Sequence, residues 1–348
     1  MTTPKFTSRQ RVLTALGHTE PDRVPFFLLL TVHGAKELNL SIRSYFSKAE
    51  NVVEGQLRMR AKYGHDCLYP FFHAALEAEA WGGEVIYFDD GPPNSGEPCI
   101  QKPDVINHLE PPQLQDSAGL KMVLSAIEML KNKADEEAPI IGVVMSPFSL
   151  PVMQMGFDKY IELIYRSPEL FDRLMQINEV FCVRWANAQL NAGATAICYF
   201  DPVASSSIIP RDIYRRTGFQ VAQRTLAQIN GPTATHLASA PCLPILEDLA
   251  QTGTAVVGVS ALEDLAELKK RANSRFSLLG NLNGIAMTHW TDRETQAHVK
   301  EAIDKAAAGG GFILADNHGE IPWQVPDSVL ATISETVQDW GRYPINRE

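Results

Sequence analysis

Short apolar runs of β-strand character alternate with amphipathic helical stretches along this chain, and that alternation limits the possible folds more than any other feature. The apolar runs that end at polar or turn residues are 24–30, 66–71, 139–145, 194–200, 232–236, 255–259, 276–279 and 311–315. The stretches between them with apolar residues every three to four positions are 49–63, 117–133, 168–191, 211–228, 261–272 and 293–308. Eight strand-then-helix units predict a parallel sheet, and eight strands close a (β/α)8 barrel, also called a TIM barrel.

Two segments depart from the alternation. An N-terminal helix is predicted at 8–17, and the segment 80–100 is typical of a hairpin inserted after the second strand. An open, doubly wound sheet is the alternative architecture, but no glycine-rich phosphate-binding fingerprint follows the first strand. Barrels of this length commonly form one unit, so we expect a single domain over residues 1–348.

Composition argues against several classes of partner. A formal net charge of -10 disfavours nucleic acid, because nucleic-acid binders usually carry a face of clustered Lys and Arg. Five scattered cysteines form an odd set that fits a reducing compartment better than a disulfide framework. The amino terminus is polar and no run of about eighteen apolar residues occurs, so we expect no signal peptide, no membrane span and a cytoplasmic location.

Polar side chains gather where the predicted strands end, which is the end of a barrel that carries function. The candidate site residues at these strand ends are His73, Glu77, Glu79, Asp201, Ser205, His236, Asn281, Asp316, Asn317 and His318. Each also has an ordinary structural interpretation. A histidine can be buried against a carbonyl group, Asp201 and Ser205 can cap the turns that follow them, and the asparagines can tie loop backbones together. If 77–79 is extended, only one of Glu77 and Glu79 can enter the pocket.

Several motifs in the same order resemble the uroporphyrinogen decarboxylase superfamily, in particular its cobamide-dependent methyltransferase branch. The motifs are Arg11-Val12-Leu13, Pro21-Asp22-Arg23-Val24-Pro25, Glu77-Ala78-Glu79-Ala80-Trp81-Gly82, Asp201-Pro202, Pro232-Thr233-Ala234-Thr235-His236, Leu279-Gly280-Asn281 and Gly311-Phe312-Ile313-Leu314. The resemblance implies a barrel that receives a methyl group from methylcobalamin carried by a corrinoid protein. True decarboxylases have an Arg-Gln-Ala-Gly-Arg segment after the first strand and an Asp after the second. Thr31-Val32-His33 and His73 stand there instead, which disfavours decarboxylation.

The resemblance also bears on the methyl acceptor. Thiol-methylating members of the branch hold a zinc ion with His-x-Cys and with a Cys before Gly, but here the two cysteines are replaced by Ala238 and His318. Since zinc serves to deprotonate a thiol, this loss predicts a metal-free site and an acceptor that is not a thiol. Tetrahydrofolate fits, because its N5 amine is already neutral at pH 7 and needs only a pterin seat and a proton acceptor.

We therefore predict methyl transfer from methylcobalamin to tetrahydrofolate. Asp201, Asp316, Asn281 and Asn317 are candidates for the donor edge of the pterin, while His236 and His318 act on the proton or the transition state. His73, Glu77, Glu79 and Ser205 are candidates for further substrate contacts.

Two alternatives remain open. One is a metal-dependent corrinoid methyltransferase, acting on a thiol or another acceptor, with His236, His318 and either Asp316 or Glu320 as zinc ligands and Cys242 as a further possible ligand. The other is a protein without catalytic activity that binds a corrinoid or tetrapyrrole as a carrier or sensor.

Overall fold

The computed structural model describes residues 6–134 and 137–345. Consecutive parallel strands form a six-stranded sheet in the order β3-β4-β5-β6-β7-β8. Their bounds are β3 Ile141–Met145, β4 Ala196–Phe200, β5 Thr233–His236, β6 Val256–Gly258, β7 Ser277–Leu282 and β8 Phe312–Asp316. Each lies within three residues of the predicted bounds at both ends.

The two remaining predicted strands close the sheet into a barrel through a few hydrogen bonds only. The Leu314 amide donates to the Pro25 carbonyl at 3.0 Å, the Asp66 amide donates to the Phe26 carbonyl at 2.8 Å, and the Ile141 amide donates to the Leu68 carbonyl at 2.9 Å. The ring therefore runs from β8 through the segments around Phe26 and Leu68 to β3. The prediction of full strands at 24–30 and 66–71 was too long.

The physical reason lies at the start of these two segments. Pro25 has no amide hydrogen to donate, and the amide of Phe26 donates to the carboxylate of Asp66 at 3.0 Å instead of to a neighbouring strand. Neither backbone nitrogen therefore donates a hydrogen bond to a neighbouring strand.

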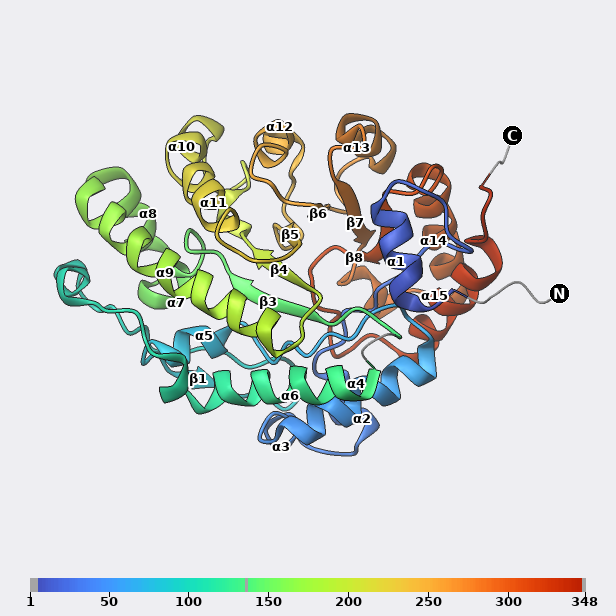
Figure 1. Ribbon diagram of the computed structural model, residues 1–348, viewed down its shortest axis with the longest axis horizontal. Coiled ribbons are helices and arrows are strands. Elements are labelled where there is room, and N and C mark those ends of the chain that lie inside the picture. The colour runs from blue at the N-terminus through green and yellow to red at the C-terminus, as the bar shows by residue number, and fades with distance from the viewer. Residues whose placement is uncertain (1–5, 135–136, 346–348) are drawn as a thin grey trace.

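Helices surround the strands, as Figure 1 shows. Their bounds are α1 Ser8–Leu16, α2 His33–Glu37, α3 Ile42–Tyr45, α4 Ala49–Tyr63, α5 Ala75–Ala80, α6 Ala118–Ala134, α7 Pro151–Met155, α8 Phe157–Arg166, α9 Pro168–Ala192, α10 Arg211–Arg216, α11 Gly218–Leu226, α12 Leu246–Leu249, α13 Leu265–Ala272, α14 Asp292–Ala306 and α15 Asp327–Trp340. Short 3-10 helices cover Pro103–His108, Leu114–Asp116, Pro202–Ala204, Leu243–Ile245 and Ala286–His289. The predicted N-terminal helix is α1, which packs against β8.

The single helix predicted over 211–228 is two helices, α10 and α11. Thr217 separates them with φ -124° and ψ -94°, and its hydroxyl donates to the Ile213 carbonyl at 2.7 Å. A threonine hydroxyl bonded to the backbone of the preceding turn commonly bends a helix.

The segment after the second barrel position contains the predicted hairpin. β1 Val85–Ile86 and β2 Asn94–Ser95 pair antiparallel, with Val85 opposite Ser95. This confirms an insertion at that place.

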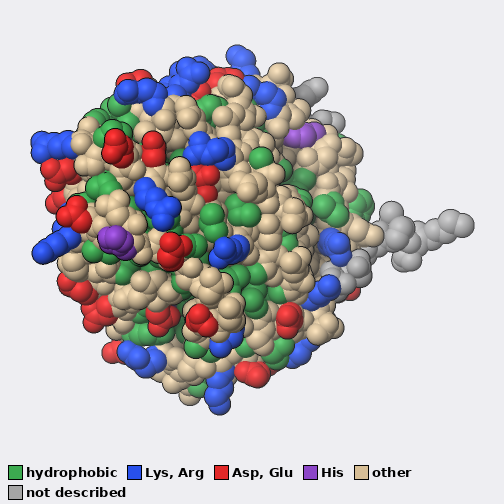
Figure 2. Space-filling view, turned by 60° about the vertical axis from the view of Figure 1, so that its left-hand side comes forward, with side chains coloured by type: hydrophobic (Ala, Val, Ile, Leu, Met, Phe, Trp, Pro, Cys, Tyr) green, Lys and Arg blue, Asp and Glu red, His purple; other side chains and the backbone are tan. Residues whose placement is uncertain are grey.

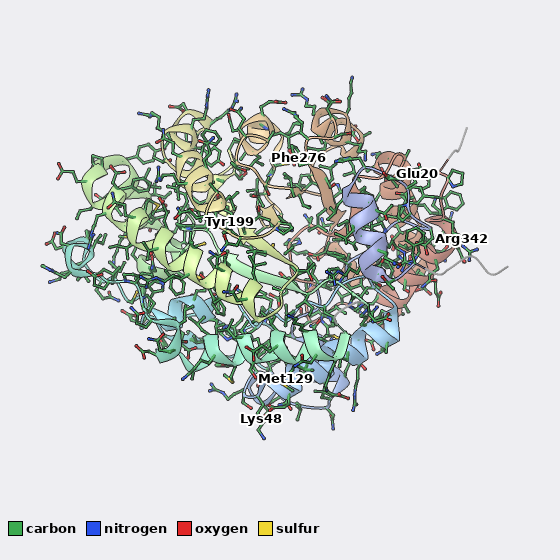
Figure 3. The ribbon with its side chains drawn as sticks, viewed as in Figure 1. Glu20, Lys48, Met129, Tyr199, Phe276 and Arg342 are labelled. Carbon is green, nitrogen blue, oxygen red and sulfur yellow. The ribbon has the colours of Figure 1, made fainter. Side chains whose placement is uncertain are left out.

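Alternate residues of one strand enter two different hydrophobic clusters. Ile313 and Ala315 of β8 belong to a cluster that includes residues of α4, α6 and α9, whereas Phe312 and Leu314 belong to a cluster that includes residues of α14 and α15. Figure 3 shows Tyr199 in the interior and Lys48 at the periphery.

The surface carries mixed charge over the face that Figure 2 shows, where Lys and Arg side chains are interspersed with Asp and Glu. No helix in the described part of the chain is both long and apolar enough to cross a membrane.

Candidate active site

An aromatic stack lies at the carboxyl ends of the strands. The ring of Phe71 stacks on Phe200, with centroids 6.4 Å apart and planes inclined by 12°, and Phe200 stacks on the imidazole of His236 at 4.9 Å and 26°. Gly258 of β6 lies against the other side of the imidazole, because a Cβ there would come within 2.3 Å of His236 Cδ2. The plane of the His236 ring is therefore fixed on both sides.

The hydrogen bonds of His236 determine its tautomer. Its Nδ1 accepts the amide hydrogen of Ala238 at 3.0 Å, so the proton of the neutral ring is on Nε2. Nε2 is buried and has no partner. Burial, and then the nearby His318, lowers the pKa of His236 to about 4, so the ring is neutral at pH 7. His236 thus presents one unused N–H donor.

The loop after β8 closes over this stack. Asp316 Oδ2 accepts the amide hydrogens of His318 and Gly319, each at 2.8 Å, and Oδ1 is buried without a partner. Burial raises the pKa of Asp316 to about 6, against the opposing effect of these amide bonds. Tyr69 donates its hydroxyl hydrogen to the Gly319 carbonyl at 3.0 Å. The loop is held from both sides and keeps one free acceptor.

Gly319 is required in this loop for two reasons. Its φ is +83°, in the left-handed region, and a Cβ would lie 2.1 Å from Phe200 Cζ. The loop therefore packs directly on the aromatic stack.

Two further titratable groups belong to the same loop. His318 is half-buried, its Nδ1 has no partner, and burial lowers its pKa. Glu320 accepts the hydroxyl hydrogen of Thr31, and burial raises the pKa of Glu320 to about 7. Asp316 acts electrostatically on Glu320 in the same direction, so the two carboxyl groups are near each other.

The two predicted asparagines tie rim loops together. Asn281 donates from Nδ2 to the Ser260 carbonyl at 3.0 Å, and the Asn317 side-chain oxygen accepts the Gly284 amide hydrogen at 3.3 Å. Asn281 also lines a cleft of about 260 Å³ together with Asn283 and Trp290. The sequence analysis did not predict this cleft.

Asp201 and Ser205 make other side-chain hydrogen bonds. The Asp201 amide donates to the His236 carbonyl at 2.8 Å, and the buried Oδ2 of Asp201 has no partner. Asp201 is fully buried, and its Oδ1 accepts hydroxyl hydrogens from Ser146 at 2.6 Å and Ser149 at 2.7 Å. Ser205 donates to the Pro241 carbonyl at 2.8 Å. Burial raises the pKa of Asp201 to about 6, although the two serines oppose the shift. Asp201 therefore contacts the β3 side of the molecule, while the two asparagines contact the β6 and β7 side.

His73 and Glu77 form a separate buried group behind Phe71. All three line a narrow cavity of about 10 Å³. Glu77 Oε1 accepts the Met145 amide hydrogen at 2.8 Å, and burial raises the pKa of Glu77 to about 8. His73 Nδ1 has no partner, and burial lowers the pKa of His73 to about 4. The 75–80 segment is helical and not extended, with Glu77 buried and Glu79 exposed.

The residues present do not fit the zinc ion that thiol-methylating members of the branch hold. Ala238 offers no donor atom, and the Nε2 of His236 carries the proton where a metal needs a lone pair. Within residues 6–134 and 137–345, no three His, Cys, Asp or Glu side chains are grouped as metal ligands. Cys242 is buried, with its own amide bonded to Glu263.

Sequence reasoning missed the residues that hold the site together. Tyr69, Phe200 and Gly319 carry no catalytic signature, and their roles depend on contacts between distant strands. The one available signal was Gly319 directly after the polar triplet at 316–318.

Comparison with known proteins finds similarity over nearly the whole chain. The sequence profile of the family described as Uroporphyrinogen decarboxylase (URO-D) matches residues 7–340. A methylcobamide:CoM methyltransferase MtaA from Methanosarcina barkeri is 25% identical over 340 residues, which cover 95% of this chain and 97% of the relative. A uroporphyrinogen decarboxylase from Xylella fastidiosa is 25% identical over 355 residues, covering 95% and 98%. The structure of a methyltransferase from Methanosarcina mazei superposes with a TM-score of 0.87 at 22% identity, covering 96% and 99%, and so shares the fold.

Proposed function

The chain belongs to the uroporphyrinogen decarboxylase family, and we propose that within it this protein transfers a methyl group from a methylated corrinoid to tetrahydrofolate. The observation that carries the proposal is the neutral, unpartnered Nε2–H of His236 beside Ala238. Where thiol-methylating relatives would hold a metal, this chain offers a hydrogen-bond donor. Such a site suits an acceptor that needs no deprotonation before it reacts.

The other family chemistry, decarboxylation, has less support. The first barrel segment runs into Thr31, which bonds Glu320, and into His33, which is buried with neither ring nitrogen partnered. Burial lowers the pKa of His33 to about 3, so it offers no positive charge to a substrate carboxylate at pH 7. A substrate with several carboxylates needs cations at this place.

The polar groups of the site match the edges of a pterin. The free Oδ1 of Asp316 suits the ring N–H and exocyclic amine, which donate, whereas the Nε2–H of His236 remains for a contact that forms mainly in the transition state. Phe71, which is partly exposed, offers flat apolar surface beside them and is backed by the buried ring of Phe200. Planar ligands commonly combine such aromatic contacts with a few fixed polar groups.

The chemical step requires orientation and one proton acceptor. The corrinoid supplies a methyl carbon whose bonding electron pair stays with cobalt, while the N5 lone pair forms the new bond. The methylated N5 then carries a positive charge and must lose its proton. Burial raises the pKa of Glu320 to about 7, and Glu320 is the carboxyl group of the same loop that can accept this proton.

A direct assay tests the proposal. Transfer from methylcobalamin is followed by its absorbance change, with tetrahydrofolate or coenzyme M as the acceptor, in the presence of a strong chelator. We expect methyl transfer to tetrahydrofolate but not to coenzyme M. We also expect saturable tetrahydrofolate binding by calorimetry. Transfer to coenzyme M that depends on zinc, or no affinity for tetrahydrofolate, would contradict the proposal.

A further inference from the structure

A cleft of about 670 Å³ lies at the end of the barrel opposite the candidate active site. Its walls come from the start of α1, the end of α4 and the end of α15, at residues that precede the first two barrel segments. Four arginines line it, namely Arg11, Arg23, Arg60 and Arg342. Such a concentration is unusual in a chain with a net charge of -10.

Two of the arginines are fully engaged by carboxylates. Arg11 contacts Asp22 at 2.6 Å and Asp66 at 2.7 Å, and Arg23 contacts Asp66 at 2.6 Å. The fully buried Asp66 also accepts the hydroxyl hydrogen of Ser8 at 2.8 Å. The charges of the two arginines are therefore balanced by those of Asp22 and Asp66, and this part of the cleft stabilises the fold.

The other two arginines have unused donors. Arg60 donates to the Ser8 hydroxyl at 3.3 Å and lies 4.0 Å from the exposed carboxylate of Glu137, while its Nε is buried without a partner. Arg342 donates from Nε to the Gln338 carbonyl at 2.9 Å. A guanidinium group has five N–H donors, so most of those on these two side chains remain available.

The backbone brings like charges together at the same place. Arg23 and Arg342 are directly opposite each other in an isolated antiparallel bridge, and Arg342 is exposed at the periphery of the molecule in Figure 3. Since Asp66 already pairs with Arg23, the bridge contributes by fixing the backbone of Arg342 beside Arg23 at the cleft.

We propose that this cleft binds the phosphate group of a small molecule through Arg60 and Arg342. Planar guanidinium groups suit the oxygens of a phosphate, and the volume is in the range of small-molecule sites. The ligand would connect the ends of α1, α4 and α15. Because the cleft is at the opposite end of the barrel, the ligand would not compete with the methyl donor or acceptor.

The test measures phosphate binding to the full chain by calorimetry at constant ionic strength. The probes are inorganic phosphate and a nucleoside monophosphate, and the variants are Arg60→Gln and Arg342→Gln. Arg58→Gln is the matched control, because Arg58 is on the same helix but exposed and paired with Glu54. We expect saturable binding that each test variant weakens by roughly tenfold, as loss of a charged hydrogen-bond pair predicts, and that the control leaves unchanged.

Two results would overturn the proposal. One is the absence of saturable binding of either probe to the wild-type chain at millimolar concentrations, and the other is equal affinity in the wild type and both test variants. Should Arg60→Gln unfold the start of α1, as thermal unfolding without ligand would reveal, the exposed Arg342 decides the result. Tighter binding of the monophosphate identifies an organic ligand, and equal binding identifies the phosphate group alone as the ligand. Activity in methyl transfer has no part in this test, so it stands independently of the proposed function.

Discussion

The imidazole of His236 lies on the ring of Phe200 with centroids 4.9 Å apart and planes inclined by 26°. The two residues end neighbouring strands, β5 and β4, and are register partners. This pairing holds the His236 ring so that Nδ1 meets the Ala238 amide and Nε2 stays unpartnered. Strand register therefore sets which nitrogen a substrate would meet.

Replacing His236 should affect rate more than binding. In His236→Ala we expect turnover to fall by about ten- to a hundredfold while tetrahydrofolate affinity stays within a few fold, because a contact made mainly in the transition state changes kcat. His318→Ala should behave likewise. Calorimetry and the methylcobalamin absorbance assay measure the two quantities separately. A large loss of affinity with unchanged turnover would show that these histidines bind ground-state substrate.

The metal content of the protein is the second prediction. Purified protein should contain well under one zinc ion per chain and keep its activity in a strong chelator, since Ala238 supplies no ligand. The double variant Ala238→Cys with His318→Cys restores the thiolates of the zinc-binding relatives and should gain zinc. Elemental analysis measures both. Stoichiometric zinc in the wild type, lost together with activity, would refute a metal-free site.

Substitutions of the two asparagines should weaken tetrahydrofolate binding, whereas substitution of Asp201 should not. Asn281→Ala and Asn317→Ala should each weaken tetrahydrofolate binding by about 1–3 kcal/mol, roughly five- to a hundredfold, if both contact the pterin. Asn94→Ala, in the β1–β2 hairpin, is the control. Wild-type affinity in both test variants would place the pterin elsewhere.

Asp201→Asn should instead lower stability. Its carboxylate accepts two serine hydroxyl hydrogens in the interior, so we expect the free energy of unfolding to fall by about 1–3 kcal/mol with nearly unchanged tetrahydrofolate affinity. Urea denaturation gives the first quantity and calorimetry the second. A loss of tetrahydrofolate affinity without a loss of unfolding free energy would show that Asp201 contacts the substrate.

Glu77 predicts a specific dependence of stability on pH. Its pKa is about 8 in the folded chain and 4.5 without the fold, so the folded state holds this proton more tightly. Its contribution to stability is present at low pH and is lost as pH rises from about 5 through 8. Relative to Glu77→Gln, which can still accept the Met145 amide hydrogen, the wild type should lose a few kcal/mol more over that range. Chemical denaturation at several pH values gives the free energy of unfolding of both proteins. The same pH dependence of this free energy in both would contradict the raised pKa of Glu77.

The identity of the donor is the last prediction. Methyl transfer should be faster when a methylated corrinoid protein replaces free methylcobalamin, because presentation by a protein supplies orientation in advance. Comparison of kcat/KM for the two donors measures the gain. Equal values with a corrinoid protein encoded beside this one would argue against a protein-borne donor.

Much of the barrel could be predicted from the sequence because its determinants are local. Apolar runs and helical periodicity located β3 to β8 and, with bounds that match to the residue, α4. Strand ends marked by polar residues also led to the prediction of His236, Asp316 and His318 as site residues, and the structure places His236 and His318 near each other. The first two barrel segments were predicted too long, since the side chain of Asp66, forty residues away in sequence, takes the amide hydrogen of Phe26.

What only the tertiary structure decided is which polar groups share an environment. Asp201 follows Phe200 by one residue, but its carboxylate is bonded to Ser146 and Ser149, whereas Phe200 contacts His236. The sequence by itself determined the residue types, the loss of the two cysteine ligands and the order of the strands. The free Nε2 of His236, the free Oδ1 of Asp316 and the burial that shifts their pKa values arise from contacts between strands distant in sequence, because burial and hydrogen-bond satisfaction belong to the packed barrel and not to any segment of it.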